Sequence, residues 1–184
     1  MSADFKPLAI TPRVPQFAAN ASGIDLSRPL PPETLDAVRA AWRDYPVLCF
    51  TDQHLDPASL QDFAAQIGPF GDDPYVAPLP DFPHVIEVKR EARETAPIFG
   101  SQWHSDWSFQ ATPPSATLLY GAEIPPSGGD TVFADCVAAY AALSPTMQSL
   151  LAGLNGVHTA APAYGPKGLF SRDDDSRSMR IIVS

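Results

Sequence analysis

The chain has 184 residues, of which 45% are hydrophobic and 18% charged, and its formal net charge at pH 7 is −9. This length favours one globular domain with its own core over two domains. No basic cluster offsets the negative charge, which argues against nucleic acid or an anionic membrane surface as a partner. No apolar run is long enough to cross a membrane and the first residues lack the apolar core of a signal peptide, so we expect a cytoplasmic protein.

Three stretches carry apolar residues at helical spacing. The first is 35–45, which follows a pair of prolines. The second is 60–67, with Asp56 as a candidate N-cap and Gly68 as the point where the pattern stops. The third is 147–154, which follows a Ser-Pro pair. Each stretch predicts an amphipathic helix with one face on the core.

Short strand-like runs lie between these helices, and prolines, of which the chain has 21, separate many of them. The run 116–122 is apolar on both faces, which predicts a central strand covered on both sides. Many short strands with turns between them favour an antiparallel sandwich or barrel with helices packed outside. The predicted strands are 47–50, 85–88, 103–109, 116–122, 131–134 and 156–159.

Two further features are interpreted conservatively. Cys49 and Cys136 lie in apolar runs, so we expect free, buried thiols and not a disulfide or a metal pair. The stretch 160–180 has no periodicity and contains three consecutive aspartates, which predicts a surface loop. The apolar run 181–183 then resembles the start of another strand.

The candidate site lies in 103–109, where His104 and Asp106 are two residues apart. In a strand, such residues project from the same face, and Trp103 and Trp107 would anchor the opposite face. An imidazole beside a carboxylate provides two adjacent positions of a facial metal site, which a distant second histidine would complete. On spacing alone a surface histidine hydrogen-bonded to a neighbouring aspartate is the commoner arrangement.

The remaining histidines have simpler interpretations. His54 follows a predicted strand in a polar turn, which predicts a solvated side chain. His84 opens the predicted strand 85–88 and should lie at its edge. His158 is expected to have a structural role and not to bind metal.

Several motifs in the same order make the chain resemble the TauD/TfdA (taurine dioxygenase-like) family of Fe(II)- and 2-oxoglutarate-dependent dioxygenases. The resemblance extends over roughly 10–158, and the order of the motifs is more specific than any one of them. The matching segments are 23–30, 46–53, 63–68, 103–109, 112–114, 123–126, 128–131 and 138–143.

The resemblance implies a mostly β fold with flanking helices, namely a double-stranded β-helix (jelly roll) that is incomplete at its C-terminal end. Residues 1–184 would form the N-terminal portion of one such domain. His104 and Asp106 match the first two iron ligands of the family, and Thr131 matches the residue whose hydroxyl helps to hold 2-oxoglutarate. Gly128 and Gly129 would permit a tight turn before Thr131. The implied cofactors are Fe(II), 2-oxoglutarate and O₂.

The sequence departs from the family pattern near the substrate site. Gly71 and Asp73 stand where taurine-binding members have histidines, and Gly100 replaces an asparagine that usually precedes the iron-binding segment. An ionised aspartate would repel a sulfonate, so we expect little activity on taurine. Phe70, Asp73 and Tyr75 are candidates for a substrate lid.

A second departure concerns residues that the sequence does not contain. The distal iron-binding histidine and the arginine that binds 2-oxoglutarate belong to a region beyond Ser184. The resemblance therefore implies a truncated product or one part of a longer gene, and we expect residues 1–184 alone to be inactive.

The resemblance favours a dioxygenase that hydroxylates a small organic substrate, such as a sulfonate, sulfate ester or aryloxy acid, and releases succinate and CO₂. Two alternatives are a non-catalytic jelly-roll protein or fragment, and a Zn²⁺-dependent hydrolase that uses the same pair of ligands. The expected partner is a small-molecule substrate, and the chain could form a homo-oligomer.

Overall fold

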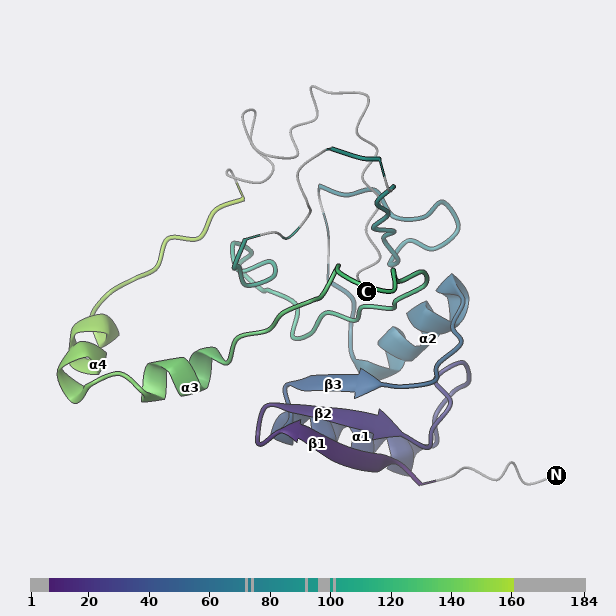
Figure 1. Ribbon diagram of the computed structural model, residues 1–184, viewed down its shortest axis with the longest axis horizontal. Helices are drawn as coiled ribbons and strands as arrows, with labels where there is room; N and C mark the ends of the chain where they lie inside the picture. Colours follow the sequence, from purple (N-terminus) through teal and green to yellow (C-terminus); the bar gives the residue numbers. More distant parts are fainter. Residues whose placement is uncertain are drawn as a thin grey trace.

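The computed structural model describes residues 7–160 except 72, 74, 92, 96–99 and 101. Figure 1 shows a small sheet near the N-terminus, two helices beside it, and a long stretch of irregular chain that leads to two further helices. The elements are β1 (Ala9–Val14), β2 (Ala18–Ser22), α1 (Pro32–Asp44), β3 (Val47–Phe50), α2 (Pro57–Ile67), α3 (Cys136–Ala141) and α4 (Pro145–Ala152).

The sheet has the order β1-β2-β3 and is mixed. Strand β1 pairs antiparallel with β2, from Ala9 opposite Ser22 to Val14 opposite Ala18, with an irregularity after Pro12. Strand β3 pairs parallel with β2, and parallel strands need a crossover connection, which α1 provides. In Figure 1, α1 lies behind the sheet.

The three predicted helices are confirmed, as α1, α2 and α4. The carboxylate of Asp56 accepts the Ser59 backbone N–H at 2.8 Å and so caps α2, which stops before Gly68. The hydroxyl of Ser144 accepts the Met147 backbone N–H at 3.2 Å and caps α4. These ends are predictable because caps are set by a few neighbouring residues.

The core lies where the sheet, α1 and α2 meet. Phe63 of α2 is 4% exposed, and its ring meets Phe50 of β3 edge to face with centroids 5.9 Å apart. Leu118 packs against this core from the irregular part of the chain. The buried cluster consists of Ile24, Leu26, Leu30, Val38 and Phe63.

Polar contacts join the irregular chain to the same core. The hydroxyl of Tyr120 accepts the Leu55 backbone N–H at 3.2 Å and donates to the Gln53 carbonyl at 3.4 Å. The Gln53 side chain in turn accepts the Leu26 N–H at 2.9 Å and donates to the Ile24 carbonyl at 3.0 Å. The segment that carries Leu118 and Tyr120 is therefore fixed to the sheet and to the start of α2.

Most of the predicted β-strands are not formed in the described residues. Within the described residues, only 47–50 of the predicted strands forms, because a strand requires a hydrogen-bonded neighbour and the other runs pair with none. The run 116–122 is also not covered on both sides, since Leu118 and Tyr120 are half-buried whereas Leu119 is 59% exposed. The runs without strand structure are 85–88, 103–109, 116–122, 131–134 and 156–159.

Three elements were not predicted, namely β1, β2 and α3. No residue of α3 or α4 is buried. Both cysteines are free, as expected, but both are exposed, so the prediction of buried thiols is wrong. Cys49 is on the open side of β3, and Cys136 begins the exposed α3.

The predicted loop 160–180, apart from Ala160, and the predicted strand 181–183 lie outside the described residues. No described helix has the length and hydrophobicity that a bilayer span requires.

Candidate metal centre and adjoining pocket

His104 and Asp106 lie side by side, although the segment around them is not a strand. His104 Nε2 is 3.0 Å from Asp106 Oδ1. The chain turns directly after the pair, because Trp107 has a positive φ of 51° and its carbonyl accepts the Gln110 N–H at 2.9 Å. The prediction that these two side chains meet is confirmed, but a turn and not a strand presents them.

The outer polar atom of each side chain is engaged by the protein. His104 Nδ1 lies 2.7 Å from the Gln102 carbonyl, and because a carbonyl only accepts, Nδ1 carries the proton and donates it. Asp106 Oδ2 accepts a hydrogen bond from Thr117 Oγ1 at 2.7 Å. These two contacts orient the imidazole and the carboxylate so that Nε2 and Oδ1 face each other.

This arrangement fits a divalent metal ion. In a neutral imidazole with its proton on Nδ1, Nε2 carries a lone pair that can bind a metal ion. Two neighbouring ligands of an octahedral metal, each about 2.1 Å from it, lie about 3 Å apart. The separation of Nε2 and Oδ1 matches this value. Both side chains are about half exposed, so the metal-facing side is open.

Gly100 lies against the candidate centre. Its φ of 67° is in the left-handed region, and a Cβ at this position would lie 3.5 Å from Cε1 of the His104 ring. A larger residue would be strained in this backbone conformation and would touch the imidazole. The backbone conformation at this position, more than the space beside His104, therefore favours glycine.

The described residues supply two donors here and no third. They contain no group of three or more His, Cys, Asp or Glu residues that could hold a metal ion. His158 Nδ1 is 2.8 Å from Ser108 Oγ, which agrees with the structural role predicted for it, and His54 is solvent-exposed as predicted. Thr131 is exposed, and Gly128 and Gly129 before it both have positive φ, 79° and 75°, as a turn of this kind requires.

The aromatic residues around the pair have different roles. Trp103 is 72% exposed, so the prediction that it anchors the segment is wrong. Trp107 meets Phe109 edge to face at 5.6 Å, and Phe109 meets Tyr75 in the same way at 5.8 Å. Tyr75, a lid candidate, is thereby linked to the residues that follow Asp106.

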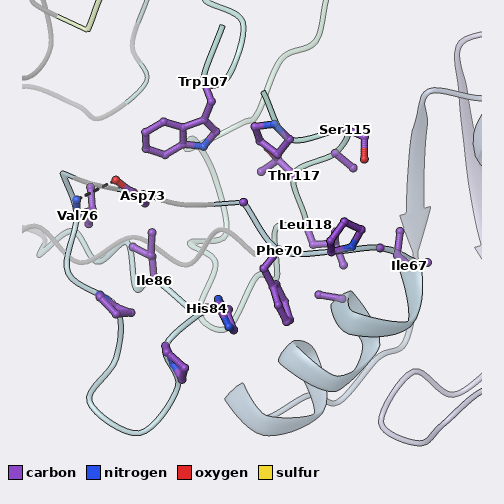
Figure 2. Close-up of a pocket in the computed structure, with 18 residues that line it drawn as sticks. Ile67, Phe70, Asp73, Val76, His84, Ile86, Trp107, Ser115, Thr117 and Leu118 are labelled. Atoms are coloured by element: carbon purple, nitrogen blue, oxygen red, sulfur yellow. Dashed lines mark hydrogen bonds between the residues drawn. The ribbon is translucent and has the colours of Figure 1, made fainter. Parts of the chain in front are cut away.

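A pocket of about 400 Å³ adjoins the candidate centre. Its walls come from the end of α2, the loop after it, the stretch around His84 and the segment 114–118. Trp107 and Thr117 are also part of its lining, so the pocket reaches the residue that follows Asp106 and the residue that holds Asp106 Oδ2. Figure 2 shows Trp107 and Phe70 on opposite sides of this space.

Two of the three lid candidates line the pocket. The Phe70 ring stacks on His84 with centroids 3.9 Å apart and planes 5° apart, so His84 is part of a wall and not the edge of a strand. Asp73 Oδ1 accepts the backbone N–H groups of Tyr75 at 2.8 Å and Val76 at 3.0 Å. Burial raises the pKa of the Asp73 carboxyl, and these two hydrogen bonds partly oppose the increase.

Thr117 and Gln102 were not identified from the sequence. Both act on the pair through hydrogen bonds, and Gln102 does so with its backbone carbonyl, which any residue would provide. Thr117 is eleven residues from Asp106, and no sequence motif marks that contact. The nearness of Gln102 to His104 in sequence was the only available signal.

The comparisons with known proteins identify the family of the chain. The taurine catabolism dioxygenase TauD, TfdA family model matches residues 6–182. The chain therefore belongs to this family, whose dioxygenases use Fe(II), 2-oxoglutarate and O₂.

Two curated relatives and one solved structure are similar to the chain. An alpha-ketoglutarate-dependent 2,4-dichlorophenoxyacetate dioxygenase from Cupriavidus pinatubonensis is 34% identical over 165 residues, which cover 81% of this chain and 57% of the relative. An alpha-ketoglutarate-dependent sulfate ester dioxygenase from Pseudomonas putida is 31% identical, covering 83% of this chain and 50% of the relative. The crystal structure of AAD-2 in complex with Mn(II) and N-oxalylglycine has a TM-score of 0.64 at 29% identity, covering 79% of this chain and 53% of that one. The chain thus spans about half the length of the curated relatives it matches.

Proposed function

We propose that this protein is an Fe(II)- and 2-oxoglutarate-dependent dioxygenase that hydroxylates a small organic substrate and releases succinate and CO₂. The observation that carries the proposal is the pair His104 Nε2 and Asp106 Oδ1, 3.0 Å apart, with the outer atom of each side chain held by the protein. A histidine and a carboxylate in this arrangement are two members of the ligand set of non-haem Fe(II) oxygenases.

Each residue of the site has a defined part in this function. His104 and Asp106 hold the metal, and the Gln102 carbonyl and the Thr117 hydroxyl keep these ligands oriented. Thr131 donates a hydrogen bond to a carboxylate of 2-oxoglutarate. Bound Fe(II), with 2-oxoglutarate and O₂, supplies the oxidation of a substrate C–H bond.

The adjoining pocket holds the substrate. Thr117 both lines this pocket and contacts Asp106, so a molecule in the pocket lies next to the ligand pair. The apolar and aromatic walls exclude water from the bond that reacts, and the Phe70–His84 stack closes the side toward α2. Phe70, Asp73 and Tyr75 form the lid over the bound substrate.

The jelly roll remains a prediction for this chain, as does the assignment of residues 1–184 to the N-terminal portion of one domain. A TM-score of 0.64 over 79% of the chain with a structure holding Mn(II) and N-oxalylglycine supports both. The segment that carries Leu118 and Tyr120 is anchored on the small sheet and the start of α2.

One experiment on the full-length gene product separates the proposed dioxygenase from the two alternatives. Adding 2-oxoglutarate to the Fe(II)-loaded protein without oxygen should give a visible metal-to-ligand charge-transfer band. A non-catalytic jelly-roll protein that has lost the site and a Zn²⁺-dependent hydrolase would both give no such band. Absence of the band at saturating Fe(II) and 2-oxoglutarate would rule the proposal out.

A substrate panel addresses the substrate class. The relatives are named for 2,4-dichlorophenoxyacetate and sulfate esters. We expect succinate release with at least one member of a panel of sulfonates, sulfate esters, aryloxy acids and amino compounds, and little release with taurine because Asp73 repels a sulfonate. Taurine as the best substrate would show that the role given to Asp73 is wrong.

A further inference from the structure

The pocket beside the ligand pair has few ionisable side chains among its described lining residues. Among the described residues that line it, Asp73 and His84 are the only ionisable side chains, and none is a lysine or arginine. The remaining walls are apolar or aromatic, apart from the Ser115 and Thr117 hydroxyls and the Trp107 indole. The described lining residues therefore offer an anion no lysine or arginine partner.

Only one of the two Asp73 carboxylate oxygens has hydrogen-bond partners among the described residues. Oδ1 accepts the Tyr75 and Val76 backbone N–H groups, as Figure 2 shows for Val76. Oδ2 is shielded from solvent and has no hydrogen-bond partner among the described residues. A carboxylate removed from water without a counter-charge is costly, and a cation nearby would recover part of that cost.

Two aromatic side chains, Phe70 and Trp107, also line the pocket. The parallel stack on His84 fixes the Phe70 ring, and the edge-to-face contact with Phe109 fixes the Trp107 indole. Aromatic faces with a nearby carboxylate are the surroundings in which proteins bind ammonium groups, through cation–π and ionic attraction together.

We infer that this pocket takes an organic ammonium, a molecule with an aromatic or apolar body and a positively charged nitrogen, and that Asp73 selects it over an anionic analogue of the same shape. The inference rests on the proposed function, because it names the substrate class for the same site. Asp73 acts through its charge across the pocket, so the selection does not require direct contact between the nitrogen and Oδ2.

Equilibrium binding tests the inference without turnover. Three ligands are compared that share a phenyl group and differ in the polar group at the other end. They are 2-phenylethylammonium, 2-phenylethanol and 3-phenylpropionate. Their affinities for the full-length gene product are measured by calorimetry at pH 8, where an ordinary imidazole is uncharged. We expect the ammonium to bind at least about tenfold more tightly than the carboxylate, with the alcohol between them, which is the size of effect that one nearby charge produces. A carboxylate that binds as tightly as the ammonium, or no saturable binding of any of the three, would overturn the inference.

Two isosteric variants locate the effect. Asp73→Asn should reduce the preference for the ammonium over the carboxylate to about twofold or less. Asp81→Asn removes the same charge from an exposed position that does not line the pocket, so it should leave the preference unchanged. Equal preferences in the parent and in folded Asp73→Asn would assign the selection to the net charge of −9 and overturn the role of Asp73. If Asp73→Asn fails to fold, the ranking of the three ligands by the parent still decides the inference. The charge-transfer band does not involve this pocket, so it tests the proposed function separately.

Discussion

The imidazole of His104 and the carboxylate of Asp106 each have two polar atoms, and the two side chains are held in a similar arrangement. One atom of each side chain is held by a hydrogen bond, from His104 to Gln102 and from Thr117 to Asp106, and the other atom faces the partner side chain. Oriented ligands bind metal more tightly, because less side-chain freedom is lost on binding. This geometry predicts that substitutions at Asp106 and at Thr117 weaken metal binding.

Asp106→Ala should abolish tight Fe(II) binding by the full-length gene product and leave it folded. The Asp106 side chain is 46% exposed, so its removal leaves no cavity in the core. Anaerobic Fe(II) titration measures the affinity, and circular dichroism follows the fold. Asp81→Ala, which removes an exposed carboxylate elsewhere, should bind Fe(II) like the parent. Unchanged affinity in Asp106→Ala would disprove its assignment as a ligand.

Thr117→Val should weaken Fe(II) binding about tenfold, within the range observed when residues that orient metal ligands are replaced. Valine has nearly the shape of threonine but cannot donate the 2.7 Å hydrogen bond to Asp106 Oδ2. Thr117→Ser keeps the hydroxyl and should retain most of the affinity. The same anaerobic titration compares the three proteins, and equal affinities for all of them would show that Thr117 has no part in holding Asp106.

At the scale of elements, α2 connects the core to the pocket. Its Phe63 packs against Phe50 of the sheet, and its last turn contributes Ala64 and Ile67 to the pocket wall. The start of this helix is fixed by Asp56, which accepts hydrogen bonds from the Ser59 hydroxyl and backbone N–H. The hydrogen bond from the Ser59 hydroxyl, and to a smaller extent the one from its backbone N–H, holds the pKa of the Asp56 carboxyl below its usual range.

Asp56→Ala should therefore lower the melting temperature at pH 7 by a few degrees. Because the pKa is lower in the folded state than its unfolded value of about 3.9, the ionised cap stabilises the fold above that pH and loses its effect as the pH falls. The difference between parent and variant should thus be largest at pH 5 and above and should shrink toward pH 3. Asp62→Ala, an exposed change in the same helix, should show no such pH dependence. A difference that is constant from pH 7 to pH 3 would contradict the role of the charge.

At the scale of the whole molecule, the N-terminal part is well packed, whereas the chain around α3 and α4 has little buried surface. The sheet, α1 and α2 enclose a shared core, whereas α3 and α4 have no buried residue and expose apolar side chains such as Val137 and Leu150. Exposed apolar side chains in this number favour association with other protein surfaces. His104 and Asp106, the proposed metal ligands, lie between these two parts in the sequence.

Residues 1–184 expressed alone should show no 2-oxoglutarate-dependent succinate formation with Fe(II), ascorbate and O₂. The described residues place two metal donors at the site, and a site with two protein ligands holds iron weakly. Thr131 by itself offers 2-oxoglutarate one neutral hydrogen bond, which is weaker than a charged pair. Size-exclusion chromatography should show self-association. Steady turnover by a monomer would mean that a third ligand lies within this chain, with His158 the first residue to test because it contacts Ser108.

The sequence by itself determined what depends on near neighbours. It predicted the caps and ends of α2 and α4, the meeting of His104 with Asp106, and the left-handed turn at Gly128 and Gly129, because each is set within a few residues. The family resemblance, which the motif order predicted, is confirmed by the match over residues 6–182.

The tertiary structure decided what depends on distant segments. Strand pairing needs a partner that local pattern does not identify, so most predicted strands are not formed and β1 and β2 were missed. The hydrogen bond from Thr117 to Asp106 and the pocket that joins Asp73, His84 and Trp107 bring together parts of the chain far apart in sequence. Such contacts form because Leu118 and Tyr120 pack on the core, and only the folded arrangement of that core sets which side chains then meet.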